Sequence, residues 1–223
     1  MGTVGVIPAA GYARRLQPID CSKEVYPVGG RPVMDFVIER MRAAPCSELR
    51  VVTRPDKRDV IEHSARRQAV VVEAEPESLA ESVLAGIEGL ADTDLVLLGF
   101  PDSIWEPLDG YARLLEFRSS GWEVALGLLG SSELTRHEPV VFDGSGQVLG
   151  IEFKPEHPSS VWTWGLAVAP AGTLRALRGE TEPGSLFDRL AGEGRVGALP
   201  LPGIFFDMGT PEGLRKAQEA LGS

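Results

Sequence analysis

The chain has 223 residues, of which 43% are hydrophobic and 24% charged, with a formal net charge of -10 at pH 7. This length suits one compact domain, and the acidic balance argues against a nucleic-acid-binding protein, which usually presents a basic surface to the phosphate backbone. No apolar run reaches the roughly 18–20 residues of a membrane span, and the start lacks a signal-peptide pattern. The sequence therefore predicts a cytoplasmic protein that contacts neither membranes nor nucleic acid.

Strand-like apolar runs and helical patterns alternate through the first half of the chain. The helical interpretation rests on spacing, because Met34, Ile38 and Met41 recur at i, i+4 and i+7 and share one face. The sequence predicts helices at 31–44, 57–68, 79–90 and 110–119 between strands at 3–7, 49–53, 69–73, 94–98 and 123–129. Such alternation implies crossover connections and a largely parallel sheet with helices on both faces, which is a three-layer α/β/α domain.

The second half has a different pattern, with shorter apolar segments broken by turn residues. It suggests antiparallel additions to the sheet, with strands expected at 140–142, 148–153 and 163–169. A last strand at 203–206 leads into a helix that ends near Leu221, for which Thr210 is the expected N-cap and Pro211 the first helical residue.

The first strand is followed by a loop of small residues and cations, "PAAGYARRLQPIDCSKEVYPVGGRP". Gly11 and the alanines beside it let a ligand approach the backbone, Arg15 can hold phosphate oxygens through two parallel hydrogen bonds, and Lys23 adds a point charge. The loop matches neither the P-loop, which closes on Gly-Lys-Ser/Thr, nor the dinucleotide pattern GxGxxG. It indicates a phosphate site of another kind, although a plain turn with solvated arginines explains the same residues.

Two carboxylates follow strand-like segments and are candidates for holding a metal ion. Asp102 lies just beyond the run that ends at Gly99, and Asp207 follows the last expected strand. Carboxyl ends of sheet strands are where open α/β domains bind ligands, and Mg²⁺ on a triphosphate takes one or two carboxylates. Asp94, at the start of its strand, would lie on the wrong edge. Structural roles remain open for both candidates, a helix cap for Asp102 and a turn brace for Asp207.

Taken together and in order, these motifs resemble the sugar-phosphate nucleotidyltransferases, which couple a nucleoside triphosphate to a sugar 1-phosphate. The entry pattern of that family, roughly A-x-G-x-G-T-R-L-x-P, then P-K-x-x-x-P-V and K-P, is matched here at Gly11, Arg15, Leu16, Pro18, Lys23, Pro27, Val28 and Pro32. The chain departs from it at Ala13, Arg14, Ser22 and Arg31. The resemblance implies a Rossmann-like nucleotide-diphospho-sugar transferase fold, a mixed and mostly parallel sheet within one domain over 1–223.

The resemblance also implies catalytic roles. Arg15 would hold the β- and γ-phosphates of the nucleotide, and Lys23 would meet the charge that develops on the transferring phosphorus. Asp102 and Asp207 would hold Mg²⁺. Catalysis of this kind consists mainly of positioning and charge neutralisation.

Substrate-binding residues follow from the same resemblance. Lys154, in a Lys-Pro element, would contact the sugar phosphate, with Glu152 and Gly165 beside the sugar. Residues 1–130, approximately, would form the nucleotide-binding half and 131–223 the sugar-phosphate-binding half. The nucleotide-binding residues that the match implies are Ala9, Ala10, Gly11, Ala13, Glu73 and Ser78. Homodimers are common among such enzymes, so a homodimer is a further expectation.

Several residues also have a purely structural interpretation. Ser78 and Glu81 have the spacing of a capping box at a helix start. Trp162 and Trp164 share one strand face, where they either wall a sugar or fill the core. The histidines, which stand apart in the sequence and are expected at the surface, are His63, His137 and His157. Neither cysteine has zinc-site spacing, so free thiols are expected at Cys21 and Cys46.

Two other functions remain open at this point. The acceptor can be an alcohol phosphate, as in cytidylyltransferases of similar minimal length. The chain can also be a regulatory module that binds a nucleotide sugar without turnover, which the altered residues Ala13 and Ser22 leave possible. Retention of both carboxylates and of Lys23 argues for an enzyme.

Overall fold

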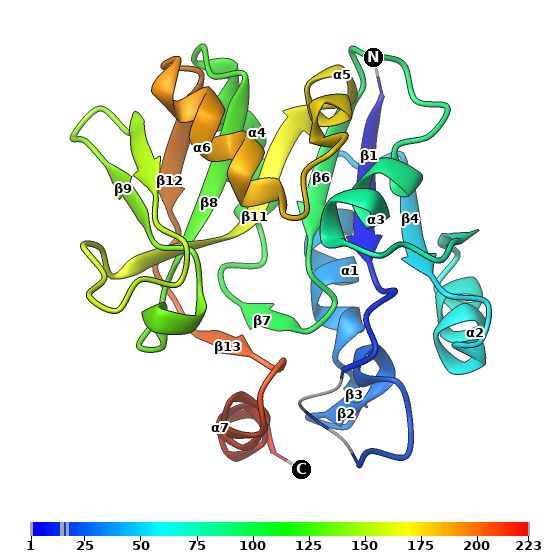
Figure 1. Ribbon diagram of the computed structural model, residues 1–223. Coiled ribbons are helices and arrows are strands. Elements are labelled where there is room, and N and C mark those ends of the chain that lie inside the picture. Colours follow the sequence, from blue (N-terminus) through cyan, green and yellow to red (C-terminus); the bar gives the residue numbers. More distant parts are fainter. Residues whose placement is uncertain (1, 14–15, 17, 223) are drawn as a thin grey trace.

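A mixed sheet forms the centre of the molecule in the computed structural model, which describes residues 2–13, 16 and 18–222 (Figure 1). The sheet has seven strands in the order β12-β8-β11-β6-β1-β4-β5. β11 runs antiparallel to both of its neighbours, and the other adjacent pairs are parallel. The strands are β1 (Thr3–Pro8), β4 (Glu48–Thr53), β5 (Val70–Glu73), β6 (Leu95–Gly99), β8 (Val124–Gly130), β11 (Trp162–Pro170) and β12 (Val196–Pro200).

Helices cover both faces of this sheet and complete three layers. One face packs against α3 (Leu79–Gly86), α5 (Ala171–Leu174) and α6 (Pro183–Gly192), and the other against α1 (Met34–Arg42), α2 (Arg58–Arg66) and α4 (Gly110–Ser119). Each face has its own buried apolar cluster, in which helix residues such as Val83 and Met41 meet the β-branched residues of the strands. The α/β/α architecture and the mostly parallel mixed sheet predicted from the sequence are confirmed.

Smaller elements lie below the carboxyl edge of the sheet in Figure 1. The described chain forms three short pairs there and beside β12, namely β2 (Pro27–Val28) with β3 (Arg31–Pro32), β7 (Ser103–Trp105) with β13 (Phe205–Asp207), and β9 (Val140–Phe142) with β10 (Val148–Ile151). A third apolar cluster, around Ile104 and Met208, joins them to α7 (Pro211–Leu221). Single 3-10 turns occur at η2 (Lys23–Val25), η3 (Leu134–Arg136) and η4 (Arg175–Leu177).

Some sequence-based boundaries change, and several elements were not predicted. Thr210 caps α7 as predicted, because its hydroxyl accepts a hydrogen bond from the Gly213 amide at 3.1 Å and Pro211 begins the helix. The last strand, β13, begins two residues later than expected, at Phe205, and ends one residue later, at Asp207. α6 and β12 were not predicted, yet β12 pairs with β8 in parallel and closes one edge of the sheet.

Candidate active site

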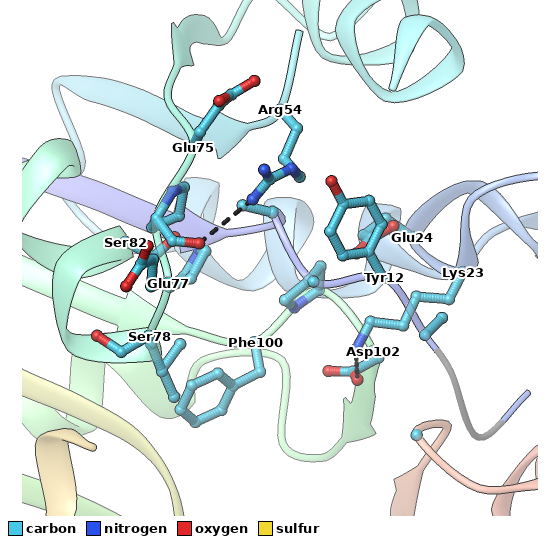
Figure 2. Close-up of a pocket in the computed structure, with 18 of the residues that line it drawn as sticks. Tyr12, Lys23, Glu24, Arg54, Glu75, Glu77, Ser78, Ser82, Phe100 and Asp102 are labelled. Atoms are coloured by element: carbon cyan, nitrogen blue, oxygen red, sulfur yellow. Dashed lines mark hydrogen bonds and ion pairs between the residues drawn. The ribbon is translucent and has the colours of Figure 1, made fainter. Parts of the chain in front are cut away.

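The loops that follow β1, β5 and β6 surround a cavity of about 810 Å³ at the carboxyl edge of the sheet (Figure 2). This edge is where open α/β domains bind their ligands. Lys23 and Asp102 point toward each other on one side of the cavity, whereas Ser78 and Ser82 lie on the other side with Glu77. The cavity therefore has a charged end beside β6 and a second end beside α3.

Lys23 and Asp102 form an ion pair at the charged end. Their Nζ and Oδ2 atoms are 2.5 Å apart, and both side chains are mostly buried. Burial alone would lower the pKa of Lys23, but the carboxylates of Asp102, Glu24 and Asp207 outweigh that effect, and its pKa is raised. Lys23 is thus held in its charged form at this end of the cavity.

Asp207 is brought to the same place by the pairing of β13 with β7. Asp207 lies opposite Ser103 in this antiparallel pair, and the Met208 amide donates to the carbonyl of Asp102 at 2.8 Å. The two carboxylates converge on Gly209, since a methyl group on Gly209 would lie 2.9 Å from Asp207 Oδ1 and 3.5 Å from Asp102 Oδ2. The missing side chain leaves a small space bounded by both carboxylates.

His137 contacts Asp207 and belongs to this site. Its Nε2 is 3.2 Å from Asp207 Oδ2, and its Nδ1 is 3.0 Å from the hydroxyl of Ser131. Burial raises the pKa of Asp207, but hydrogen bonds from His137 and from the Gly209 amide overcome this, and its pKa is lowered. The carboxylate is thus held in its charged form.

The sequence-based expectation that all three histidines are at the surface is wrong for two of them. His137 lies in the site, and His63 is buried with its Nε2 2.7 Å from Asp35 Oδ1. His157 is exposed, as expected. A lone histidine in sequence gives no sign of its partner when that partner is far along the chain, as Asp207 is from His137.

The loop after β1 contributes three of its four predicted small residues to the cavity wall, Ala10, Gly11 and Ala13. Ala9 is fully buried instead, and its carbonyl accepts a hydrogen bond from Lys57. Ala13 has a φ of +50°, a left-handed conformation that is strained for alanine and that the family's glycine adopts freely. Arg15, the predicted partner of the β- and γ-phosphates, lies outside the described residues.

The two residues predicted to lie near the nucleobase are placed differently. Ser78 lines the cavity and also caps α3, because its hydroxyl accepts from the Glu81 amide at 3.1 Å. Glu81 reaches back to the Glu77 amide at 2.7 Å, one residue before the position that a capping box predicts. Glu73 is exposed at the end of β5 and is not among the residues that line the cavity. From the loop that follows β5, Glu75 and Glu77 line it instead.

A second cavity, of about 220 Å³, adjoins the first at Phe100 and Asp102, which line both. Two of the three residues predicted to bind the sugar phosphate, Lys154 and Gly165, line this cavity. Glu152 does not line it and accepts a hydrogen bond from the Ser159 amide at 3.0 Å. Gly165 has a packing reason to be glycine, since a methyl group there would lie 2.3 Å from a methyl carbon of Leu129.

Trp164 lies between the core and the second cavity. It packs edge-on against Phe187 in the core and lines the second cavity, where its indole N–H donates to Glu138 Oε2 at 2.7 Å. Burial raises the pKa of Glu138. Trp162 packs against the core. Glu138, which also lines the second cavity, was not predicted as a site residue.

Among the described residues, no three or more His, Cys, Asp or Glu side chains form a cluster able to hold a metal ion by themselves. A site completed by a ligand remains compatible with Asp102 and Asp207, because Mg²⁺ is usually bound by one or two carboxylates together with substrate phosphates. In the described part of the chain, no helix combines the length and apolar character needed to cross a bilayer.

Fold and site together define a three-layer α/β/α domain with a large cavity at the carboxyl edge of its sheet. The chain belongs to the family of MobA-like NTP transferase domains, which matches residues 5–190.

Individual relatives agree with this family. The chain is 26% identical over 221 residues to a glucose-1-phosphate thymidylyltransferase of Streptomyces griseus, covering 92% of this chain and 62% of that protein. It is 33% identical over 112 residues to a 2-C-methyl-D-erythritol 4-phosphate cytidylyltransferase of Escherichia fergusonii, 49% of this chain and 47% of that protein. The matched region thus spans 62% of the length of the first relative and 47% of the length of the second.

Solved structures share the fold at low sequence identity. A UDP-glucose pyrophosphorylase from Acinetobacter baumannii superposes with a TM-score of 0.84 at 19% identity, covering 100% of this chain and 94% of that one. A UDP-glucose pyrophosphorylase complexed with UDP-glucose superposes with a TM-score of 0.85 at 17% identity, covering 99% and 98%. The overall fold therefore extends over almost the whole of both proteins.

Proposed function

We propose that the protein is a Mg²⁺-dependent nucleotidyltransferase that couples a nucleoside triphosphate to a sugar 1-phosphate. The observation that carries this proposal is the convergence of Asp102, Asp207 and Lys23 where the two cavities meet. The larger cavity has room for a nucleotide, and the smaller one, with Lys154 in its wall, suits a phosphorylated acceptor. The glucose-1-phosphate thymidylyltransferases among the relatives support this acceptor class.

The reaction is an in-line displacement at the α-phosphorus. An oxygen of the acceptor phosphate forms a new P–O bond to that phosphorus, while the bond to the β-phosphate oxygen breaks and pyrophosphate leaves with the electron pair. Lys23, kept protonated by its carboxylate neighbours, offsets the charge on the transferring group. Lys154 would hold the acceptor phosphate. Both roles consist of binding and orientation, which suits phosphoryl transfer because little covalent chemistry is required of the protein.

Asp102 and Asp207 are the residues that would hold Mg²⁺. The space beside Gly209, which a Cβ would fill, and the two carboxylates that bound it fit a small cation with oxygen ligands. Mg²⁺ bound there would neutralise phosphate charge on the nucleotide. His137 would keep Asp207 oriented and ionised for that purpose.

A second candidate acceptor is an alcohol phosphate, which the erythritol-phosphate cytidylyltransferase among the relatives favours. The chemistry at the α-phosphorus is the same, so only the acceptor distinguishes the two functions. The cytoplasmic location and the homodimer remain predictions from the sequence.

The test is release of pyrophosphate from each of ATP, CTP, GTP, UTP and dTTP with panels of sugar 1-phosphates and alcohol phosphates, with and without EDTA. Lys23→Ala and Asp102→Asn should each lower kcat/KM by about 100-fold or more, since the first removes a cation aimed at the transferring phosphate and the second removes a carboxylate proposed to hold Mg²⁺. Asp109→Asn is the matched control, because Asp109 is exposed at the start of α4. Equal activity of Asp102→Asn and Asp109→Asn would contradict the assignment.

A further inference from the structure

A buried lysine lies against the loop that follows β1. Lys57 precedes α2, and its Nζ donates to the carbonyl of Ala9 at 2.7 Å, to the carbonyl of Gly11 at 3.1 Å and to Glu24 Oε2 at 2.6 Å. An ammonium group has three hydrogens, so each of them has a partner. Residues 9–13 are named here the entry loop. Lys57 therefore binds the carbonyls of two residues of the entry loop, Ala9 and Gly11, which are separated by one residue.

The direction of these carbonyls determines the direction of the next amides. In a planar trans peptide the C=O and the following N–H point to opposite sides. The N–H groups of Ala10 and Tyr12 consequently point away from Lys57. The entry loop is also a partition, because Gly11, Tyr12 and Ala13 line both the 810 Å³ cavity and a separate cavity of about 220 Å³ that contains Lys57.

Stability alone does not account for this charged pair. Lys57 is 8% exposed and Glu24 is fully buried, so both charges have lost most of their hydration. Glu24 Oε1 has no hydrogen-bond partner among the described residues. Buried ion pairs often contribute no more to stability than apolar residues of the same volume. What an apolar pair could not do is hold the carbonyls of the entry loop.

Asp59, in the first turn of α2, contacts the chain at Ser22, between β1 and the 3-10 turn η2. Asp59 accepts hydrogen bonds from the Ser22 amide at 2.7 Å and from the Ser22 hydroxyl at 2.8 Å. Ser22 stands where related sequences were expected to have proline, which has neither donor. Serine at this position thus makes two hydrogen bonds to Asp59 that proline could not make. Ser22 immediately precedes Lys23.

We propose that Lys57, with Glu24 as its counter-ion, is a positioning residue that turns the amides of Ala10 and Tyr12 toward the phosphates of the nucleotide. Preformed N–H donors bind phosphate without an ordering cost at the moment of binding. The identity of the ligand rests on the proposed function, whereas the anchoring of the loop does not.

The first experiment measures nucleotide binding without turnover. Calorimetry with Mg²⁺ and each of ATP, CTP, GTP, UTP and dTTP identifies the triphosphate that binds the wild type most tightly. Lys57→Met should weaken that binding at least tenfold. Arg58→Met removes the same charge one residue along, at an exposed position, and should change the affinity less than twofold.

A double variant separates positioning from folding. Lys57→Met leaves Glu24 as a buried unpaired charge, so the variant is expected to melt at a lower temperature. Adding Glu24→Gln removes that charge and should restore the melting temperature. The affinity of this double variant for the triphosphate should remain at least tenfold weaker than that of the wild type. The acceptor KM at saturating triphosphate should change less than threefold. Affinity within twofold of wild type in the double variant would overturn the proposal, as would an equal loss in Arg58→Met.

Hydrogen exchange keeps the inference independent of the proposed function. In the absence of ligand, the amides of the entry loop should exchange at least fivefold faster in the Lys57→Met/Glu24→Gln variant than in wild type. Unchanged exchange would mean that Lys57 does not fix the loop and would refute the proposal. If the wild type binds no triphosphate, the proposed function fails, and with it the nucleotide part of this inference.

Discussion

Gly209→Ala is a small change in the space beside the two carboxylates, and its effect follows from distances. The added methyl group would lie 2.9 Å from Asp207 Oδ1, whereas an ordinary contact is about 3.5 Å. Asp207 must therefore move by roughly 0.5 Å, and the methyl would occupy space proposed for Mg²⁺. The Gly209 amide, which donates to Asp207 Oδ1, is retained, and φ of Gly209 lies outside the left-handed region.

The expected result is a loss of activity accompanied by a loss of stability. Misplacement of a reacting group by 1 Å costs about 100-fold, so a decrease of roughly 10- to 100-fold in kcat/KM is expected, or about 1.4–2.7 kcal/mol of transition-state stabilisation. Crowding should lower the free energy of unfolding by about 1–3 kcal/mol.

The assay is pyrophosphate release as a function of Mg²⁺ concentration, with thermal melting in parallel. Gly192→Ala is the matched control, because a methyl group there meets no atom within 4 Å and the residue ends a helix. The control should keep its activity and melt at the same or a higher temperature. A Gly209→Ala protein with wild-type kcat/KM and Mg²⁺ dependence would refute the placement of the metal site.

Three further predictions concern single contacts. His137→Gln removes the imidazole hydrogen bond that helps to keep the pKa of Asp207 low; that pKa should rise, so the acid limb of the pH profile of kcat/KM should move to higher pH, and an unmoved limb would exclude this role. Tyr111→Phe deletes a buried hydroxyl that donates to a backbone carbonyl of β6 at 2.9 Å, so urea denaturation should show about 1–2 kcal/mol less stability, and no change would mean that the bond contributes nothing net. Gly86→Ala adds a methyl 2.4 Å from a β1 side chain, so thermal melting should show a loss of about 1–3 kcal/mol although alanine favours helices; a rise in stability would show that α3 can shift away from the sheet.

The sequence predicted the architecture because its first half has strong apolar periodicity. Residues such as Met34, Ile38 and Met41 mark a helix face, and uninterrupted runs such as Leu95–Gly99 mark buried parallel strands. β12 gave no such signal. The ring of Trp122 leaves no room for a side chain at position 197, and a strand that contains small residues such as Gly197 resembles a loop in sequence. α6 did carry a signal, the apolar spacing of its buried residues Leu186, Phe187 and Leu190, between glycines that suggest turns.

The site was predicted only where local motifs carry it. Lys23 and Asp102 follow recognisable segments, and the structure brings them into contact although they are 79 positions apart. Lys57 and His137 were not predicted, because their roles depend on contacts with residues far along the chain. Lys57 contacts Glu24, 33 positions away, and His137 contacts Asp207, 70 positions away. Such contacts depend on strand order and on the pairing of β13 with β7, which apolar periodicity does not specify.

The most direct test of the central claim is to follow the nucleotide itself. With Mg²⁺, the preferred triphosphate and a matching sugar 1-phosphate, phosphorus NMR should show a nucleotide diphosphate sugar and pyrophosphate formed in equal amounts. Formation should cease when Mg²⁺ is chelated or Lys23 is replaced by alanine. Tight binding of nucleotide or nucleotide sugar without product, across both sugar and alcohol phosphates, would contradict the enzymatic function and indicate a binding module.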